Sequence, residues 1–116
     1  MKILRISLAA LALILFAAGA AQAQASKMTT ATVHIYGNCG MCEKTIEGAA
    51  YKKGEASADW DKTTKQAVIA YDASKTSLDD VLKRIADSGY DNEKYRAPDK
   101  AYNKLHTCCK YERKPL

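Results

Sequence analysis

The stretch that decides the fold is TATVHIYGNCGMCEKTIEGAAYKK, residues 30–53. Residues 30–36 alternate between apolar and polar side chains, a pattern typical of a strand with one buried face. A glycine and an asparagine then interrupt the pattern, and from Cys42 onward apolar residues recur at helical spacing. The segment therefore predicts a strand, a loop that carries Cys39 and Cys42, and a helix.

The downstream sequence predicts four further elements. Residues 56–60 and 66–71 alternate on either side of a polar turn, which indicates a hairpin. Residues 76–89 begin with a capping Thr or Ser, have two aspartates in the first turn, carry one apolar stripe and end at a glycine, as a helix does. Residues 90–95 are predicted to form a short polar strand. The expected order is βαββαβ.

The start of the chain has the features of an export signal. Two basic residues precede the apolar run 6–21, and a small-x-small pattern ends at Ala23. A retained anchor is the alternative, but the run is shorter than the roughly 20 residues that span a bilayer. We predict a signal peptide at residues 1–23, although cleavage after Ala25 also fits, and a leader at 24–29. The expected location is the periplasm, without stable membrane insertion after cleavage.

The charge of the chain does not point to nucleic acid. The formal net charge is +5 at pH 7, and part of it leaves with the signal. The lysines are scattered among acids rather than gathered in a stripe, which is typical of a solvated surface. We therefore expect one small domain that does not bind nucleic acid.

All four cysteines lie in the exported part, where disulfides are permitted. They come as two close pairs, which suggests shared ligands or a redox couple rather than single links between distant segments. Two thiolates three residues apart can converge on one soft ion, and two-coordinate geometry suits Cu(I) or Hg(II), whereas Zn(II) prefers four ligands. The nearby helix start should stabilise a thiolate, which would serve metal binding and redox chemistry equally.

These features resemble the heavy-metal-associated domain family, which includes small copper chaperones and the periplasmic mercuric-ion-binding protein. The resemblance covers residues 30–96 and rests on GNCGMC at 37–42, on DSGYD at 87–91 and on the order of the elements. It implies an α+β, ferredoxin-like fold, in which an antiparallel sheet carries two helices on one face. It also implies that Cys39 and Cys42 are the metal ligands.

The loop departs from the usual family motif, which reads Gly-Met-x-Cys-x-x-Cys. Gly37 stands two residues before Cys39, and the nearby Met41 lies between the cysteines. In the family, the missing methionine is mostly buried and anchors the loop. Tyr90 falls where family members often place a lysine or an aromatic residue beside the loop, so it is either a neighbour of the metal site or a packed core aromatic.

Two other interpretations of Cys39 and Cys42 remain open. A strand, then C-G-x-C, then a helix is also the local order of a thioredoxin-like dithiol oxidoreductase. Such a fold would need a cis-proline well downstream, and no proline lies between Cys42 and Pro98. A plain structural disulfide is the other alternative. We favour metal binding.

The tail, residues 97–116, carries Cys108 and Cys109. Pro98 suits the first turn of a helix, and the apolar spacing that follows predicts a short C-terminal helix bearing this pair. Three roles stay open: a bridge to the first pair, free thiols with one in the core, or thiols that fold back to the metal site. In the last case up to four thiolates converge, and zinc or a Cu(I) cluster becomes a candidate.

The remaining candidate ligands are the two histidines. His106 lies two residues before Cys108, and we expect it to be solvated. His34 falls on the polar face of the first strand and is not predicted to be a ligand. No serine or carboxylate pair lies in a recognisable nucleophile or acid–base motif, so we do not expect an enzyme.

The sequence therefore predicts an exported carrier or scavenger of soft metal ions. Cu(I) is the first choice of ion and Hg(II) the second. Ligand exchange with a partner's thiolates would transfer the ion. The expected partners are a metal-transporting membrane protein or another thiolate carrier, and the chain could alternatively be an accessory module that docks on a membrane pump.

Overall fold

The computed structural model describes residues 28–115. The predicted signal peptide, residues 1–23, and residues 24–27 of the predicted leader lie outside the described part. Between residues 28 and 115, none of the helices has the length and apolar character needed to cross a membrane.

Three strands form one antiparallel sheet. They are β1 (Met28–His34), β2 (Ala56–Trp60) and β3 (Gln66–Asp72), and β3 lies between the other two. Alternation gives the sheet one buried face, since Ala67 and Ile69 of β3 are fully buried while Val68 is half exposed. The bounds of all three strands lie within two residues of those predicted.

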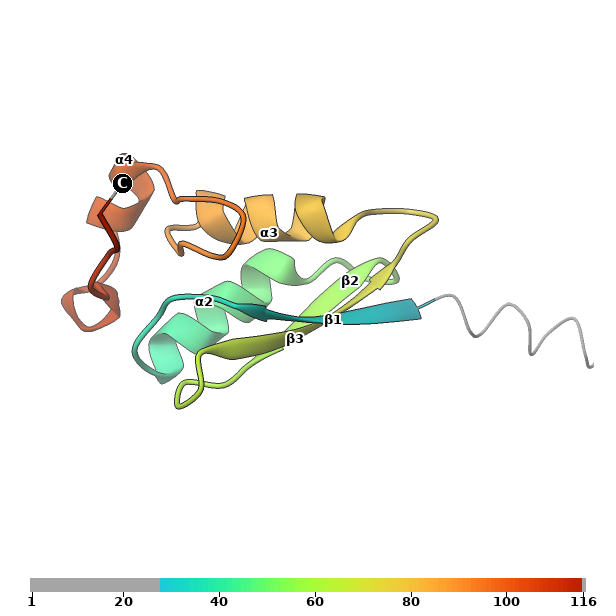
Figure 1. Ribbon diagram of the computed structural model, residues 1–116, viewed down its shortest axis with the longest axis horizontal. Coiled ribbons are helices and arrows are strands. Elements are labelled where there is room, and N and C mark those ends of the chain that lie inside the picture. The colour runs from blue at the N-terminus through green and yellow to red at the C-terminus, as the bar shows by residue number, and fades with distance from the viewer. Residues whose placement is uncertain (1–27, 116) are drawn as a thin grey trace, which may run out of the picture.

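Two helices pack against the sheet, and Figure 1 shows them lying side by side. They are α2 (Gly40–Ala50) and α3 (Leu78–Asp87). The helix α3 begins as predicted, because the Ser77 hydroxyl accepts a hydrogen bond from the backbone N–H of Asp80. The guanidinium of Arg84 donates to carbonyls at the end of α2, which joins the two helices. The predicted ferredoxin-like α+β sandwich is confirmed.

The predicted last strand is reduced to a single bridge between Ile35 and Asn92. The Asn92 side chain explains why pairing stops there. Its Oδ1 accepts hydrogen bonds from the backbone N–H groups of Lys94 and Tyr95, so the chain curls into a turn beside β1.

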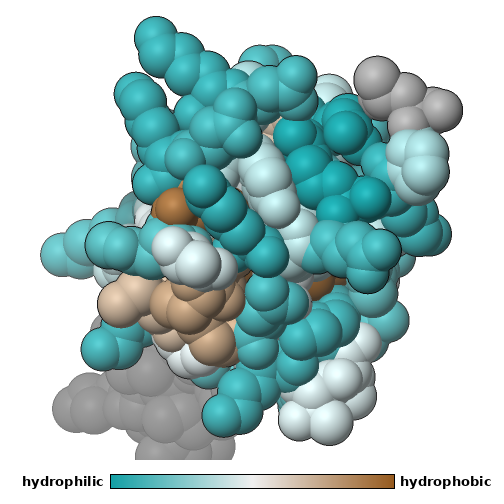
Figure 2. Space-filling view, turned by 90° about the vertical axis from the view of Figure 1, so that its left-hand side faces the viewer, coloured by the Kyte–Doolittle hydropathy of each residue, from teal (hydrophilic) through white to brown (hydrophobic). Residues whose placement is uncertain are grey.

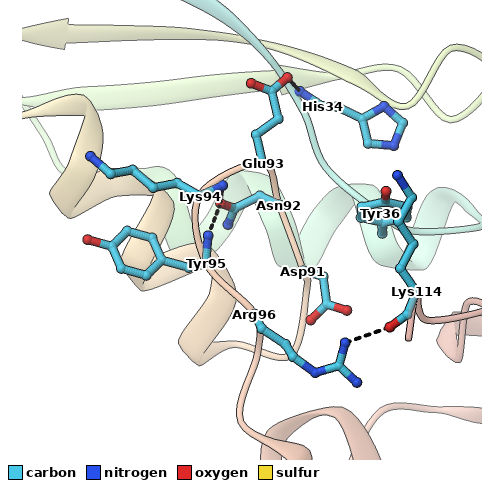
Figure 3. A pocket seen from close by; sticks show the side chains of 9 residues that line it. All are labelled: His34, Tyr36, Asp91, Asn92, Glu93, Lys94, Tyr95, Arg96 and Lys114. Atoms are coloured by element: carbon cyan, nitrogen blue, oxygen red, sulfur yellow. Dashed lines mark hydrogen bonds between the residues drawn. The ribbon is translucent and has the colours of Figure 1, made fainter. Parts of the chain in front are cut away.

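Beside this loop lies an open pocket of about 560 Å³, and Figure 3 shows the nine polar and aromatic residues that line it, from His34 to Lys114.

The tail forms a shorter helix than predicted. The helix α4 covers only Asp99–Asn103, and the cysteines lie on a separate 3₁₀ turn, η1 (Thr107–Cys109). The last bonds of α4 are of the 3₁₀ type, from Lys104 to Ala101 and from Leu105 to Tyr102. In Figure 1 the tail occupies the end of the molecule at which the loop before α2 also lies.

Candidate metal centre

The loop between β1 and α2 positions the first pair of cysteines. Cys39 has extended backbone geometry immediately before α2, and Cys42 lies in the first turn of that helix, where it is fully buried. Their Sγ atoms are 3.5 Å apart. The Cys42 sulfur also accepts a hydrogen bond of 3.5 Å from the backbone N–H of Asn38. The loop therefore presents two sulfur atoms at one point.

A tryptophan packs against Gly37, the position at which the family motif has a methionine. The Trp60 indole is 1% exposed, and its Nε1 donates to the carbonyl of Ile35 at 3.0 Å. A Cβ atom on Gly37 would lie 3.0 Å from two carbons of the indole ring and 3.3 Å from the Cβ of Cys42. Because residue 37 is a glycine, the loop can lie directly against the indole ring of Trp60, which packs against it.

The 3₁₀ turn brings the second pair of cysteines to the first. The Cys39 Sγ lies 3.7 Å from that of Cys108 and 3.6 Å from that of Cys109. The Sγ atoms of Cys108 and Cys109 are 3.9 Å apart. All four cysteines are free thiols, and Cys108 is exposed whereas Cys42 and Cys109 are buried. The tail pair therefore lies beside the first pair, as the fold-back role requires, and both of its thiols are also free, with Cys109 in the core. Within residues 28–115 no bridge joins the two pairs.

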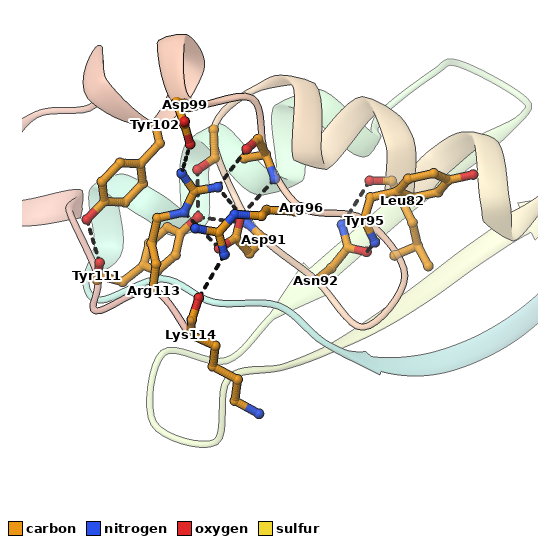
Figure 4. A network of polar contacts seen from close by, with 12 residues as sticks. Leu82, Asp91, Asn92, Tyr95, Arg96, Asp99, Tyr102, Tyr111, Arg113 and Lys114 are labelled. Carbon is orange, nitrogen blue, oxygen red and sulfur yellow. Dashed lines mark hydrogen bonds and ion pairs between the residues drawn. The ribbon is translucent and has the colours of Figure 1, made fainter. Parts of the chain in front are cut away.

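A buried network holds the tail in this position, as Figure 4 shows. Both Nε and Nη2 of Arg113 donate to the Asp91 carboxylate, at 3.0 and 2.8 Å, and Nη1 reaches Asp99 at 2.8 Å. The Tyr111 hydroxyl donates to the Gly89 carbonyl and accepts from the Asp91 N–H, each at 2.8 Å. These bonds tie the end of the chain to the loop that follows α3.

The same network reaches η1 through aromatic packing. Tyr111 is buried, stacks on Tyr36 and Tyr90, and accepts a hydrogen bond of 2.6 Å from the Tyr102 hydroxyl at its carbonyl. Because Tyr111 follows Cys109 by only two residues, its fixed position also fixes η1.

The thiols of Cys39 and Cys109 have pKa values shifted in opposite directions. The pKa of Cys39 is lowered to about 6, chiefly because the backbone N–H of Cys42 and then the Cys42 thiol donate to its sulfur. Contacts with the tail thiols add to this, and partial desolvation opposes it. Burial raises the pKa of Cys109, and its contact with Cys42 raises it further. A thiolate is therefore favoured at Cys39, whose sulfur lies within 3.7 Å of the other three cysteine sulfurs.

Tyr90 combines the two roles considered for it. It is a core residue, 1% exposed, and its phenol contacts the thiols of Cys109 and Cys42. Burial raises the pKa of the Tyr90 phenol, followed by its hydrogen bond with Cys109. It can therefore serve as a neutral hydrogen-bonding neighbour of the sulfur atoms.

Met41 is a feature of the site that sequence reasoning missed. Its Sδ lies 3.9 Å from the Sγ of Cys108, and the side chain is 49% exposed. Its place inside the C-x-x-C motif was the signal from which the sequence could have indicated it.

Figure 2 shows the end of the molecule where the loop and tail lie, and a small hydrophobic patch stands out there on a mostly hydrophilic surface.

The other candidate ligands lie apart from the thiols. Between residues 28 and 115, His34 and His106 belong to neither group of side chains spaced to hold a metal ion. One such group is Cys39 with the tail pair, and the other is the acidic trio Glu43, Glu47 and Asp59. Within the acidic trio, Glu47 has a structural role, because one of its oxygens accepts a hydrogen bond from the backbone N–H of Trp60.

Fold and site together define a small ferredoxin-like domain with a cysteine centre in its first β–α loop. Three solved structures are similar to it. The CopZ metallochaperone is 29% identical, with a TM-score of 0.52, over 55% of this chain and 98% of its own. A putative copper-ion-binding protein from Bacillus anthracis strain Ames is 25% identical, with a TM-score of 0.53, over 57% and 96%. Oxidized MerP from Ralstonia metallidurans CH34 is 34% identical, with a TM-score of 0.52, over 57% and 94%. The chain belongs to the heavy-metal-associated domain family.

No protein-family model and no curated protein sequence matches the chain. The structural matches span nearly the whole of each neighbour but little more than half of this chain. The chain is therefore longer than the domain it shares with them.

Proposed function

We propose that this protein binds a soft metal ion as its cargo, with Cu(I) first and Hg(II) second. Cys39 and Cys42 are the primary ligands, and Cys108 and Cys109 are additional ones. The observation that carries the proposal is the convergence of four free thiols, 3.5 to 3.9 Å apart along four contacts, on a heavy-metal-associated fold. Thiolates select soft, low-coordinate ions over hard ones.

The protein acts as a carrier or scavenger through ligand exchange. An incoming thiolate of the partner binds the ion, a three-coordinate intermediate forms, and a thiolate of this protein leaves. Cys108 is exposed, so it is the ligand that a partner can reach first. The partner is a metal-transporting membrane protein or another thiolate carrier, and the structural neighbours, named as a metallochaperone and a putative copper-ion-binding protein, support this role over an enzyme.

Export through the predicted signal peptide, residues 1–23, would place the carrier in the periplasm. A bound ion would there protect the thiols from oxidation. Docking as an accessory module of a membrane pump is the alternative mode of action, and co-purification with the pump would distinguish it from a free carrier.

A dithiol oxidoreductase is the second candidate function. The lowered pKa of Cys39 and the distance of 3.5 Å to the Cys42 sulfur suit thiol–disulfide exchange as well as metal binding. The ferredoxin-like fold argues against a thioredoxin-like enzyme. Insulin reduction that survives metal chelation would favour the oxidoreductase.

An anaerobic Cu(I) titration against a chromophoric competitor tests the proposed carrier. The double variant Cys39→Ser, Cys42→Ser should lose tight binding because the remaining two thiols lack the loop ligands. Circular dichroism should show that the variant stays folded, and Thr45→Ser on the exposed side of α2 is the control. An unchanged affinity for Cu(I) in a folded double variant would contradict the proposal.

A further inference from the structure

We infer that the thiols form two overlapping positions for Cu(I), which share the Cys39 sulfur as a bridge. One position lies between Cys39 and Cys42, and the other lies among Cys39, Cys108 and Cys109. This inference rests on the proposed function and goes beyond it in assigning the number of ions and the ligands of each.

The sulfur positions fall into two sets. Cys39, Cys108 and Cys109 have their Sγ atoms within 4.8 Å of one another, and Cys42 stands outside this group. Cys42 instead pairs with Cys39, at 3.5 Å. The Cys39 sulfur lies at 3.5 to 3.7 Å from each of the other three cysteine sulfurs, so it belongs to both sets.

In this arrangement the four sulfurs are spread too far apart for one ion to bind all of them. Sulfurs that bind the same ion are at most two bond lengths apart, which is about 4.6 Å for a metal–thiolate bond of about 2.3 Å. The trio meets this limit, with separations of 3.6, 3.7 and 3.9 Å. Adding Cys42 to the trio exceeds it, so a single tetrahedral zinc ion is disfavoured and two low-coordinate ions are favoured.

The three-sulfur position is preformed by the fold. The side chains of Arg113 and Asp91 are only 11% and 9% exposed, and the ion pair between them holds the chain just after η1. Cys109 is itself 2% exposed. Because the tail is already in place, binding the ion does not have to order it, which favours affinity.

Charge also favours two Cu(I) ions over one, and softness favours Cu(I) as the ion. Each bound Cu(I) offsets one thiolate, and uncompensated charge is costly at Cys42 and Cys109, which are buried. The Met41 thioether, 3.9 Å from the Cys108 sulfur, adds a soft neutral donor at the exposed rim.

Anaerobic titration of the reduced protein with Cu(I), in the presence of a chromophoric Cu(I) competitor, tests this arrangement. The wild type should bind two equivalents tightly. The variant Cys108→Ser, Cys109→Ser and the variant Cys42→Ser should each bind one, so the stoichiometry halves in both. Copper X-ray absorption should give an average of between two and three sulfur neighbours in the wild type and two in the tail variant.

The controls separate folding from binding. Thr107→Ser lies in the same turn without a thiol change and should keep two equivalents. Cys108→Ser alone spares the buried Cys109 and should weaken the second equivalent at least tenfold, which covers the case in which the double tail variant unfolds. One tight equivalent in the wild type, or two in the folded tail variant, would overturn the two-position arrangement. Absence of tight binding in the wild type would instead overturn the proposed function itself.

Discussion

Gly37 and Trp60 show how single residues shape the cysteine loop. The Trp60 indole packs directly against the loop, because Gly37 has no side chain that would separate the loop from the ring. A buried aromatic ring with its N–H hydrogen-bonded is a rigid platform. At Gly37, where the family motif has a methionine, the loop is therefore packed by a large side chain from β2.

Replacing Gly37 with alanine should destabilise the protein. The new Cβ would meet the indole at 3.0 Å, and overpacking of this kind typically costs about 1–3 kcal/mol. Urea unfolding followed by the fluorescence of Trp60, the only tryptophan, measures the change. Gly40→Ala is the matched control, because its Cβ would have no neighbour within 4 Å. Equal stability of the two variants would contradict the packing role of Gly37.

The turn after α3 governs the tail at the scale of elements. Gly89 has a φ of +114°, a left-handed conformation that favours glycine. Gly89 packs against Leu105 in the segment after α4, and its carbonyl accepts a hydrogen bond from the Tyr111 hydroxyl. The end of α3 and the position of η1 are thus coupled through one residue.

Gly89→Ala should therefore loosen the tail and expose Cys109. The added Cβ would lie 2.8 Å from Cδ2 of Leu105 and 3.1 Å from the carbonyl oxygen of Ala101, in a backbone conformation that alanine disfavours. The rate at which a thiol reagent labels Cys109 in the native protein should rise at least several-fold, as followed by peptide mass mapping. Gly48→Ala, in open space on α2, should leave the rate unchanged. A rate that stays at the wild-type value in Gly89→Ala would argue against this coupling.

At the scale of the whole molecule, one buried ion pair joins the tail to the domain. Burial alone would raise the pKa of Asp91, but the hydrogen bonds from Arg113 and from the Ala97 N–H outweigh it, and the pKa lies below its usual value. A carboxyl with a lowered pKa in the folded state stabilises the fold above its unfolded pKa, about 3.9, and this stability is lost as the pH falls through the folded pKa. The tail is therefore most firmly held near neutral pH.

Asp91→Asn should reduce the free energy of unfolding at pH 7 by about 1.5–3 kcal/mol, the range for hydrogen bonds to charged groups. The difference from the wild type should shrink as the pH falls below the folded pKa, because the wild-type carboxyl is then neutral as well. Urea unfolding of both proteins at a series of pH values measures this difference in the free energy of unfolding. Asp99→Asn is the control, since that partner of Arg113 is 82% exposed and should matter much less. A difference that does not change with pH would show that Asp91 is not the titrating anchor.

Periodicity predicted most of the domain because its signals are local. The alternation in β1 and β3, the cap and stripe of α3 and the position of the C-x-x-C loop depend on neighbouring residues only, so the sequence alone determined them. The prediction of a last strand at residues 90–95 was wrong except for one bridge, because the Asn92 side chain accepts hydrogen bonds from the backbone N–H groups that a strand would have presented.

Tertiary structure alone decided how the two cysteine pairs relate. The sequence separates Cys39 from Cys109 by 70 positions, and its helical spacing suggested only that the tail could fold back. What brings the sulfurs to 3.6 Å is the burial of Tyr111 and the pairing of Arg113 with Asp91. Such long-range packing depends on how all the elements meet, because a buried charge and a buried phenol must find their partners across the fold, and no local pattern specifies which partners those will be.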